Sequence, residues 1–209
     1  MTLVTHSSPG GGTDVFLRDL SKHLSGVMKT NFAVENIRGG SGAKALAHVA
    51  KAAPDGYTLF MATYGAMSAV PSLHKAMHYD PVKDFTPISQ VGNAPSIMLV
   101  PNSSPARTVK EWIDYAKKNP GRLNYASSGN GTIVQLTAEL FKAQADLFVV
   151  HIPYKGTALA IPDLVSGKVD VLFDSLPTGL PHVRDGRLRA LGVTTLKATP
   201  LAPRVPPIA

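Results

Sequence analysis

The sequence contains no cysteine and only one tryptophan among its 209 residues. The lack of cysteine excludes disulfides, thiolate nucleophiles and cysteine-ligated metal sites. Charged residues are also scarce, at 17% of the chain, which argues against an intrinsically disordered protein. No apolar run reaches the roughly 18 to 20 residues that a membrane-spanning helix requires. We therefore expect a globular chain with an apolar core, in one large domain or two small ones.

The N-terminal segment lacks the features of a signal peptide. Met1 is followed directly by TLVTHSSPGGG, with neither a basic segment nor a long apolar segment. We expect no signal peptide in the chain as given, and this expectation does not exclude export.

Acidic residues are fewer than basic ones, 14 against 21, and the net charge is +7 with histidine neutral. The lysines and arginines are scattered and form no dense run, so we do not expect a nucleic-acid partner. Two interpretations of the charge stay open: a basic, solvated surface, and a site for a small anionic ligand.

Short apolar strands alternate with amphipathic helices along most of the chain, and this alternation predicts an α/β fold with mostly parallel sheets. Strands are predicted at 3–6, 32–36, 57–63, 123–127, 147–152, 169–175 and 188–195, and helices at 15–24, 42–53, 108–118, 132–145 and 157–167. The pattern predicts a first α/β domain over 1–96, a second over 97–195, and a crossover or irregular tail over 196–209.

Three glycine-rich loops each follow a predicted strand and precede a predicted helix: SSPGGGTD at 7–14, RGGSGAK at 38–44 and SSGNGT at 127–132. Glycine lets a ligand approach the backbone closely, and a helix N-terminus supplies N–H groups and partial positive charge. In open α/β sheets, ligands bind beyond the carboxyl ends of the strands. The loops therefore predict an anion site, with simple tight turns as the alternative.

No established phosphate or catalytic pattern accompanies these loops. Neither GxxxxGK[ST], GxGxxG, GxSxG nor HExxH occurs. His74 and His78 stand four residues apart without a third ligand, so no metal site is predicted. Ser127 and Ser128 would need a nearby histidine to act as nucleophiles, and the sequence indicates none. We therefore predict no catalytic residue, no metal and no cofactor.

Four further residues have two interpretations each. Asp14 is either an acid of the first helical turn or a residue that orients water or a ligand amino group. Asp174 either caps the turn after its strand or faces the ligand as a selective acceptor. Lys155 is either a solvated lysine or a charge for the anion. Tyr64 is either ordinary packing or a wall of the site.

Six segments, taken together and in order, resemble a known family. They are PGGGTD, RGGSGAKALAHVAKAAPDGYTL, YDPVKDFTPIS, NPGRLNYASSGNGT, HIPYKGTALAIPDLVSGKVDVLFDSLPT and HVRDGRLRALGVTT. They are similar to the substrate-binding proteins of tripartite tricarboxylate transporters, the Bug or TctC type of periplasmic receptor. The resemblance extends from Leu3 to Pro207.

The resemblance implies a two-domain, periplasmic-binding-protein-like fold of type II that closes on its ligand in an interdomain cleft. It implies a monomeric periplasmic receptor, not an enzyme, which delivers a small organic carboxylate to the membrane components of the transporter. In the family the chain continues past the point that corresponds to VPPIA and returns to the first domain. The first domain is therefore expected to be incomplete here.

The resemblance also implies which residues hold the ligand carboxylate, chiefly through backbone amides and hydroxyls of two loops. Transferred by motif, the expected ligand-binding residues are Pro9, Gly10, Gly11, Gly12, Thr13, Asp14, Gly40, Ser41, Thr63, Tyr64, Ser127, Ser128, Gly129, Asn130, Gly131, Thr132, Lys155 and Asp174.

Two other functions stay open from the sequence. One is a small-metabolite enzyme that uses an aspartate or a histidine in the cleft as a general base. The other is a shortened receptor that no longer binds a ligand. Turnover of a ligand would favour the first, and cooperative unfolding without any response to ligands would favour the second.

Overall fold

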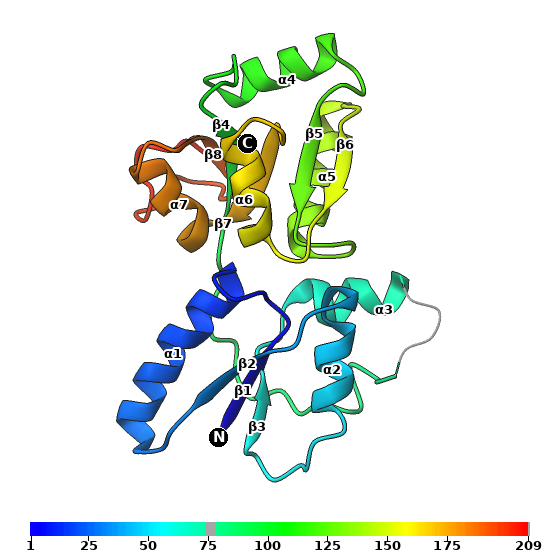
Figure 1. Ribbon diagram of the computed structural model, residues 1–209, viewed down its shortest axis with the longest axis vertical. Coiled ribbons are helices and arrows are strands. Elements are labelled where there is room, and N and C mark those ends of the chain that lie inside the picture. The colour runs from blue at the N-terminus through cyan, green and yellow to red at the C-terminus, as the bar shows by residue number, and fades with distance from the viewer. Residues whose placement is uncertain (74–77, 209) are drawn as a thin grey trace. The chain divides into compact units, whose positions relative to one another are not determined.

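Figure 1 shows the computed structural model of the chain, which describes residues 1–73 and 78–208. These residues form two compact units. The first comprises Met1–Gly92 and Gly129–Ile133, and the second comprises Asn93–Ser128 and Val134–Ala209. The loop at 129–133 thus groups with the first unit, although the sequence-based division assigned it to the second domain. The domain boundaries at 96 and 195 stay a prediction.

The first unit is built on a parallel sheet with the strand order β2-β1-β3. The strands are β1 (Thr2–Thr5), β2 (Ala33–Asn36) and β3 (Thr58–Phe60), and helices α1 (Gly12–Met28) and α2 (Ala43–Val49) connect them. Because β1 is central, successive right-handed crossovers lead to opposite sides of the sheet. Accordingly, α1 and α2 lie on opposite sides of these strands in Figure 1.

Short helices complete the described part of the first unit. A 3₁₀ helix, η1 (Gly40–Gly42), precedes α2, and a π-helix, η2 (Gly65–Ala69), runs into α3 (Val70–Leu73). Tyr79 returns to η2, where its hydroxyl donates to the Ala66 carbonyl oxygen at 3.2 Å. This contact joins the chain after α3 to a small apolar core on the α2 side.

The second unit contains a five-stranded sheet with the order β6-β5-β7-β4-β8. Its strands are β4 (Ser96–Pro101), β5 (Asn124–Ser127), β6 (Val150–Pro153), β7 (Val171–Ser175) and β8 (Leu188–Val193). β5 pairs in parallel with β6 and β7, while β4 is antiparallel to both of its neighbours. The prediction of an α/β fold with mostly parallel sheets is confirmed.

Helices cover both faces of this sheet. They are α4 (Val109–Lys118), α5 (Ile133–Ala145), α6 (Thr157–Val165) and α7 (Leu176–Arg184). Alternate residues of β4 point to opposite faces: Met98 packs in the apolar cluster of α4 and α5, and Ile97 packs in that of α6 and α7. β4 therefore reads as a continuous apolar run because both of its faces are buried.

Helix α4 starts with a capping box formed by Thr108 and Glu111. The Thr108 hydroxyl accepts the Glu111 N–H at 3.1 Å, and the Glu111 carboxylate accepts the Arg107 N–H at 2.7 Å. At the start of α5, the Thr132 hydroxyl donates to the Gly129 carbonyl oxygen at 2.7 Å.

The segment after β8 packs on the second unit. Ala202 and Val205 are buried in the same apolar cluster as Val193. The Val193 N–H donates to the Pro206 carbonyl oxygen at 2.9 Å, and the Ile208 N–H donates back to Val193 at 2.9 Å. The tail thus continues the hydrogen bonding of the sheet beside β8. Among the helices of the described residues, none combines the length and apolarity needed to cross a membrane.

Candidate ligand-binding loops

The first glycine-rich loop connects β1 to α1 and leads into a helix N-terminus that no side chain caps. Gly11 is the N-cap residue, and its own N–H donates to the Ser8 carbonyl oxygen at 2.9 Å. Gly10 adopts φ 78°, a left-handed conformation that glycine allows without strain. The first N–H groups of α1 have no acceptor within their helix, and they carry the positive end of its dipole, as an anion site requires.

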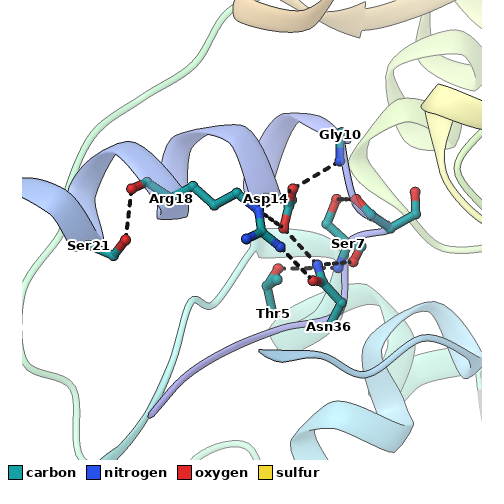
Figure 2. A network of polar contacts seen from close by, with 8 residues as sticks. Thr5, Ser7, Gly10, Asp14, Arg18, Ser21 and Asn36 are labelled. Atoms are coloured by element: carbon teal, nitrogen blue, oxygen red, sulfur yellow. Dashed lines mark hydrogen bonds and ion pairs between the residues drawn. The ribbon is translucent and has the colours of Figure 1, made fainter. Parts of the chain in front are cut away.

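Asp14 is a first-turn acid whose carboxylate organises this loop (Figure 2). It accepts hydrogen bonds from the Gly10 N–H at 2.9 Å, from Asn36 Nδ2 at 2.8 Å and from Arg18 Nε at 3.0 and 3.1 Å. Asn36 Nδ2 also donates to the Ser7 carbonyl oxygen at 2.9 Å. The network therefore ties the loop to the end of β2.

The surroundings of Asp14 favour the interpretation of Asp14 as an acid of the first helical turn. Asp14 is only 1% exposed. Burial raises the pKa of the Asp14 carboxyl, but hydrogen bonds from Arg18, Asn36 and the Gly10 N–H outweigh it and hold the pKa below its usual value. The charged carboxylate is thus already hydrogen-bonded to donors of the protein itself. A direct contact between Asp14 and a ligand stays a prediction that this network does not favour.

Two buried polar atoms beside the loop have no hydrogen-bond partner within the described residues: Ser8 Oγ and His6 Nδ1. Ser8 is 4% exposed, and its Oγ lies 3.6 Å from the position that a Cβ on Gly11 would take. An unpartnered hydroxyl therefore faces the uncapped start of α1. Since buried polar groups in folded proteins normally have partners, Ser8 is a candidate ligand contact.

Sequence reasoning missed Ser8 and His6. Both lie at the carboxyl end of β1, directly before the glycines, and this position was the available signal. Burial lowers the pKa of His6 to about 4, so the imidazole is neutral near neutral pH. Its ring packs beside Phe60, with the ring centroids 6.3 Å apart.

The second glycine-rich loop packs against the first. Residues 39–42 all have positive φ, and the non-glycine Ser41 has φ 52°. A Cβ on Gly42 would lie 2.8 Å from Ala66 Cβ and 3.3 Å from His6 Cγ. This position requires glycine for both its conformation and its space. Gly40 and Ser41 therefore lie in a loop that touches the first one, and their role in ligand binding stays a prediction.

Thr63 and Tyr64 follow β3 and lead into η2. The Thr63 carbonyl oxygen accepts the Met67 N–H at 3.1 Å, while Tyr64 is 69% exposed. A π-helical turn such as η2 is rare and often lies at a functional site. A Cβ on Gly65 would lie 2.8 Å from the Gly131 carbonyl oxygen, so the third loop packs on η2 backbone to backbone.

The third loop begins at Ser127, the last residue of β5. Ser127 is fully buried, and its carbonyl oxygen accepts the Tyr154 N–H at 3.0 Å. Gly129 and Gly131 have φ 132° and 76°. The residues after Ser128 then join the first unit, where a Cβ on Gly131 would lie 2.6 Å from Leu73 Cδ1. Thr132 is buried as well, and Asn130 is exposed.

The structure shows a histidine beside Ser127 that the sequence did not indicate. His151 Nε2 lies 2.6 Å from Ser127 Oγ. The two residues belong to neighbouring parallel strands, in which Tyr125 pairs with His151 and Ser127 with Pro153. The strand register brings the two residues together. Because they lie 24 positions apart in the sequence, the sequence did not reveal this contact.

The two remaining predicted residues lie in the second unit. Lys155 is exposed in the turn between β6 and α6. Asp174 ends β7, is 2% exposed and accepts the Thr178 hydroxyl at 2.8 Å. Burial raises the pKa of Asp174, against hydrogen bonds from Thr178 and Thr157 that lower it. Asp174 therefore caps the turn into α7, and its contact with a ligand stays a prediction, as does that of Lys155.

Within residues 1–73 and 78–208, no group of three histidine or acidic side chains could hold a metal ion. His74, one of the pair considered from the sequence, lies outside the described residues.

Known structures place the fold in the class of periplasmic binding proteins. The chain matches Rpa4515 of R. palustris, determined with adipate, at a TM-score of 0.97 and 36% identity, over 100% of this chain and 70% of that one. It matches MatC from Rhodopseudomonas palustris, determined with bound malate, at a TM-score of 0.91 and 29% identity, over 99% of this chain and 70% of that one. The predicted fold class is therefore confirmed.

The chain belongs to the tripartite tricarboxylate transporter receptor family, whose model, "Tripartite tricarboxylate transporter family receptor", matches residues 16–209. It is 33% identical to the protein BugT of Bordetella pertussis, over 96% of this chain and 62% of that protein. These matches confirm the Bug and TctC resemblance. They also agree with the expectation that the chain is not an enzyme, because the family consists of receptors. The chain spans about three fifths of the length of the curated relatives it matches.

Proposed function

We propose that the chain is the ligand-binding part of a periplasmic receptor that binds a small dicarboxylate and presents it to the membrane components of a tripartite transporter. The observation that carries the proposal is the buried, unpartnered Ser8 hydroxyl beside the uncapped N-terminus of α1. Together these groups offer several hydrogen-bond donors and a partial positive charge, the complement of a carboxylate.

The loop that carries this site is held in place before a ligand arrives. Asp14 fixes its backbone at Gly10 and, through Asn36, at Ser7. Donors that are already oriented bind an anion without a further cost in loop ordering. A second end of the ligand would contact residues of the third loop, from Gly129 to Thr132, through backbone amides and hydroxyls.

Two relatives support the choice of a dicarboxylate. Rpa4515 was determined with adipate and MatC with malate, and they match 100% and 99% of this chain. A charge of +7 further favours a dianion over a neutral solute. A periplasmic location and a membrane partner follow from the family, and they are part of the proposal.

Thermal unfolding with a panel of carboxylates tests the proposal. The panel contains hexanoate, succinate, malate, adipate and citrate. At about 100 times its Kd, a ligand should raise the free energy of unfolding by about 2.7 kcal/mol and thus the midpoint of the transition. A selective rise with one dicarboxylate supports the proposal and identifies the ligand class. A sharp transition that no carboxylate moves contradicts it.

The variant Ser8→Ala separates a ligand contact from a structural role. Because the hydroxyl has no partner within the described residues, its removal should leave the stability of the ligand-free chain unchanged or slightly higher. Loss of a hydrogen bond to a carboxylate should weaken binding by about tenfold or more. The matched control is Ser166→Ala, since Ser166 Oγ donates to the Asp163 carbonyl oxygen at 3.0 Å in an exposed turn. The control should leave the affinity unchanged.

A further inference from the structure

His151 is held in one orientation by its neighbours on β5. Its ring stacks on Tyr125, with the centroids 4.7 Å apart and the planes inclined by 15°. In this orientation Nε2 reaches Ser127 Oγ at 2.6 Å. Aromatic pairs on adjacent strands stabilise one another, so the stack limits rotation of the imidazole.

The opposite edge of the ring indicates its tautomer. His151 Nδ1 lies 3.4 Å from Gln135 Nε2 of α5. We infer that this amide nitrogen donates to Nδ1, which assigns the proton of the neutral ring to Nε2. Nε2–H then donates to Ser127 Oγ. A doubly protonated ring would direct an N–H group at the amide nitrogen, which is an unfavourable contact between two donors.

The charged groups around the imidazole belong to α5. Glu139 accepts the Tyr125 hydroxyl and lies 2.9 Å from Lys142 Nζ. Lys142 Nζ is 5.2 Å from the centroid of the Tyr125 ring. Burial lowers the pKa of His151, Glu139 raises it and Lys142 lowers it, with a net decrease from its usual value. The neutral ring that the hydrogen bonds require is therefore also favoured near neutral pH.

Ser127 is the point at which β5 becomes the third loop. Its carbonyl oxygen is fixed by the Tyr154 N–H, and its hydroxyl by His151. The loop that follows has glycines at positive φ, which do not by themselves set its direction. The contacts at Ser127 therefore fix the residue from which the chain leaves the strand toward Gly129.

We propose that His151 is a positioning residue for ligand binding, which acts through the Ser127 hydroxyl to fix the start of the third loop. The expected effect of His151 on ligand affinity rests on the proposed function. The expected effect of His151 on the third loop does not. When His151 is protonated, Nδ1 becomes a donor that Gln135 Nε2 cannot accept, so the amide and the ring reorient and the contact between Nε2 and Ser127 Oγ weakens. The third loop then loosens and the dicarboxylate binds less tightly.

The first test needs no ligand. Long-range ¹⁵N–¹H correlation spectra of the ¹⁵N-histidine-labelled chain report the tautomer and pKa of His151. We expect the Nε2–H tautomer at neutral pH, and amide shifts of Ser128 to Thr132 that titrate together with His151. An Nδ1–H tautomer, or loop amides that do not follow this titration, would overturn the proposal. This result stands whether or not a carboxylate binds.

The second test measures affinity for adipate by calorimetry as the pH falls from about 7.5 to about 5. His151→Gln keeps an N–H donor for Ser127 but cannot titrate, and His151→Phe keeps the ring stack without a donor. We expect the wild type to lose about three- to tenfold more affinity than His151→Gln over this range. Because both proteins meet the same adipate, protonation of the ligand itself cancels in the comparison. Equal pH profiles would overturn the proposal.

A double-mutant cycle distinguishes positioning from general damage. At neutral pH, His151→Phe and Ser127→Ala should each weaken adipate binding, and the double variant should be no weaker than either one. Additive losses would show that the two residues act separately, against the proposal.

The control for the pH profile is His23→Gln. His23 is an exposed histidine of α1, and its change should leave the pH profile unaltered. If no dicarboxylate of the panel binds the wild type at any pH, the proposed function is wrong, and the ligand-free spectra still decide the role of His151.

Discussion

A single buried carboxylate, that of Asp14, determines the conformation of the first ligand loop. It accepts hydrogen bonds from the Gly10 N–H of the loop, from the Arg18 guanidinium and from the Asn36 side-chain amide. Hydrogen bonds to a charged acceptor contribute more than neutral ones. The loop therefore depends on an interaction that involves no ligand.

Asp14→Asn should lower the free energy of unfolding by about 2 kcal/mol, because its amide cannot accept all of these donors and leaves some unpaired. Urea unfolding measures the change. The matched control is Asp19→Asn on the same helix, where the carboxylate is exposed and only approaches His23. The control should change stability by less than about 0.5 kcal/mol. Equal effects of the two variants would contradict the structural role of Asp14.

His6 should make stability depend on pH. Its pKa is lowered from 6.5 to about 4, so the unfolded chain binds the proton more tightly than the folded one. The contribution of the neutral ring is complete above the unfolded pKa and is lost as the pH falls toward the folded pKa. Between about pH 7 and about pH 5 the loss amounts to about 2 kcal/mol.

The variant His6→Phe isolates this effect. It keeps an aromatic ring beside Phe60 and removes the unpartnered nitrogen. Its stability should fall by about 2 kcal/mol less than that of the wild type over the same pH interval, measured by urea unfolding. His151 contributes with the same sign in both proteins and cancels in the difference. Parallel pH profiles would show that His6 is not buried as a neutral ring.

At the scale of elements, the contact between η2 and the third loop has no room for a side chain. A Cβ on Gly65 would meet the backbone of 131–133, at 2.8 Å from the Gly131 carbonyl oxygen. Backbone atoms cannot rotate away as a flexible side chain can. The short π-helix therefore serves as a platform that fixes where the loop lies.

Gly65→Ala should separate this loop from η2 and lower the stability by about 1 to 3 kcal/mol, with weaker adipate binding. The control is Gly26→Ala in α1, where a Cβ would meet nothing within 4 Å. Alanine is a better helix former, so this control should raise stability by about 0.5 to 1 kcal/mol. Thermal unfolding and adipate titration of both variants measure the contrast. A Gly65→Ala protein with unchanged stability would contradict the close packing.

For the molecule as a whole, the net charge of +7 predicts that salt weakens the binding of a dianion. Adipate affinity should fall severalfold as the ionic strength rises from about 0.02 M to about 0.5 M, because the Debye length shortens from about 20 Å to about 4 Å. Titration calorimetry in sodium chloride measures this fall. Sucrose is the control, since it adds no ions. An affinity that does not depend on salt would show that only local contacts attract the ligand.

Much of the element order follows from local sequence patterns. The alternation of apolar strands and amphipathic helices predicts the α/β class, and Thr108 with Glu111 predicts the start of α4. These features depend on residues close together in the chain. The predicted loops at 7–14, 38–44 and 127–132 likewise follow strands and precede helices, as the structure shows. The sequence also carries the family resemblance that the comparisons confirm.

Only the tertiary structure decided which of these features meet. Local pattern does not encode strand register, so the contact of Ser127 with His151 emerged only from the pairing of β5 with β6. Burial likewise depends on the whole fold: it left Ser8 Oγ without a partner among the described residues, and it surrounds the Asp14 carboxylate with donors from its own loop and from β2. Sequence by itself determined the kinds of elements and loops, because their causes are local. Their contacts, protonation and roles were decided by packing between distant segments.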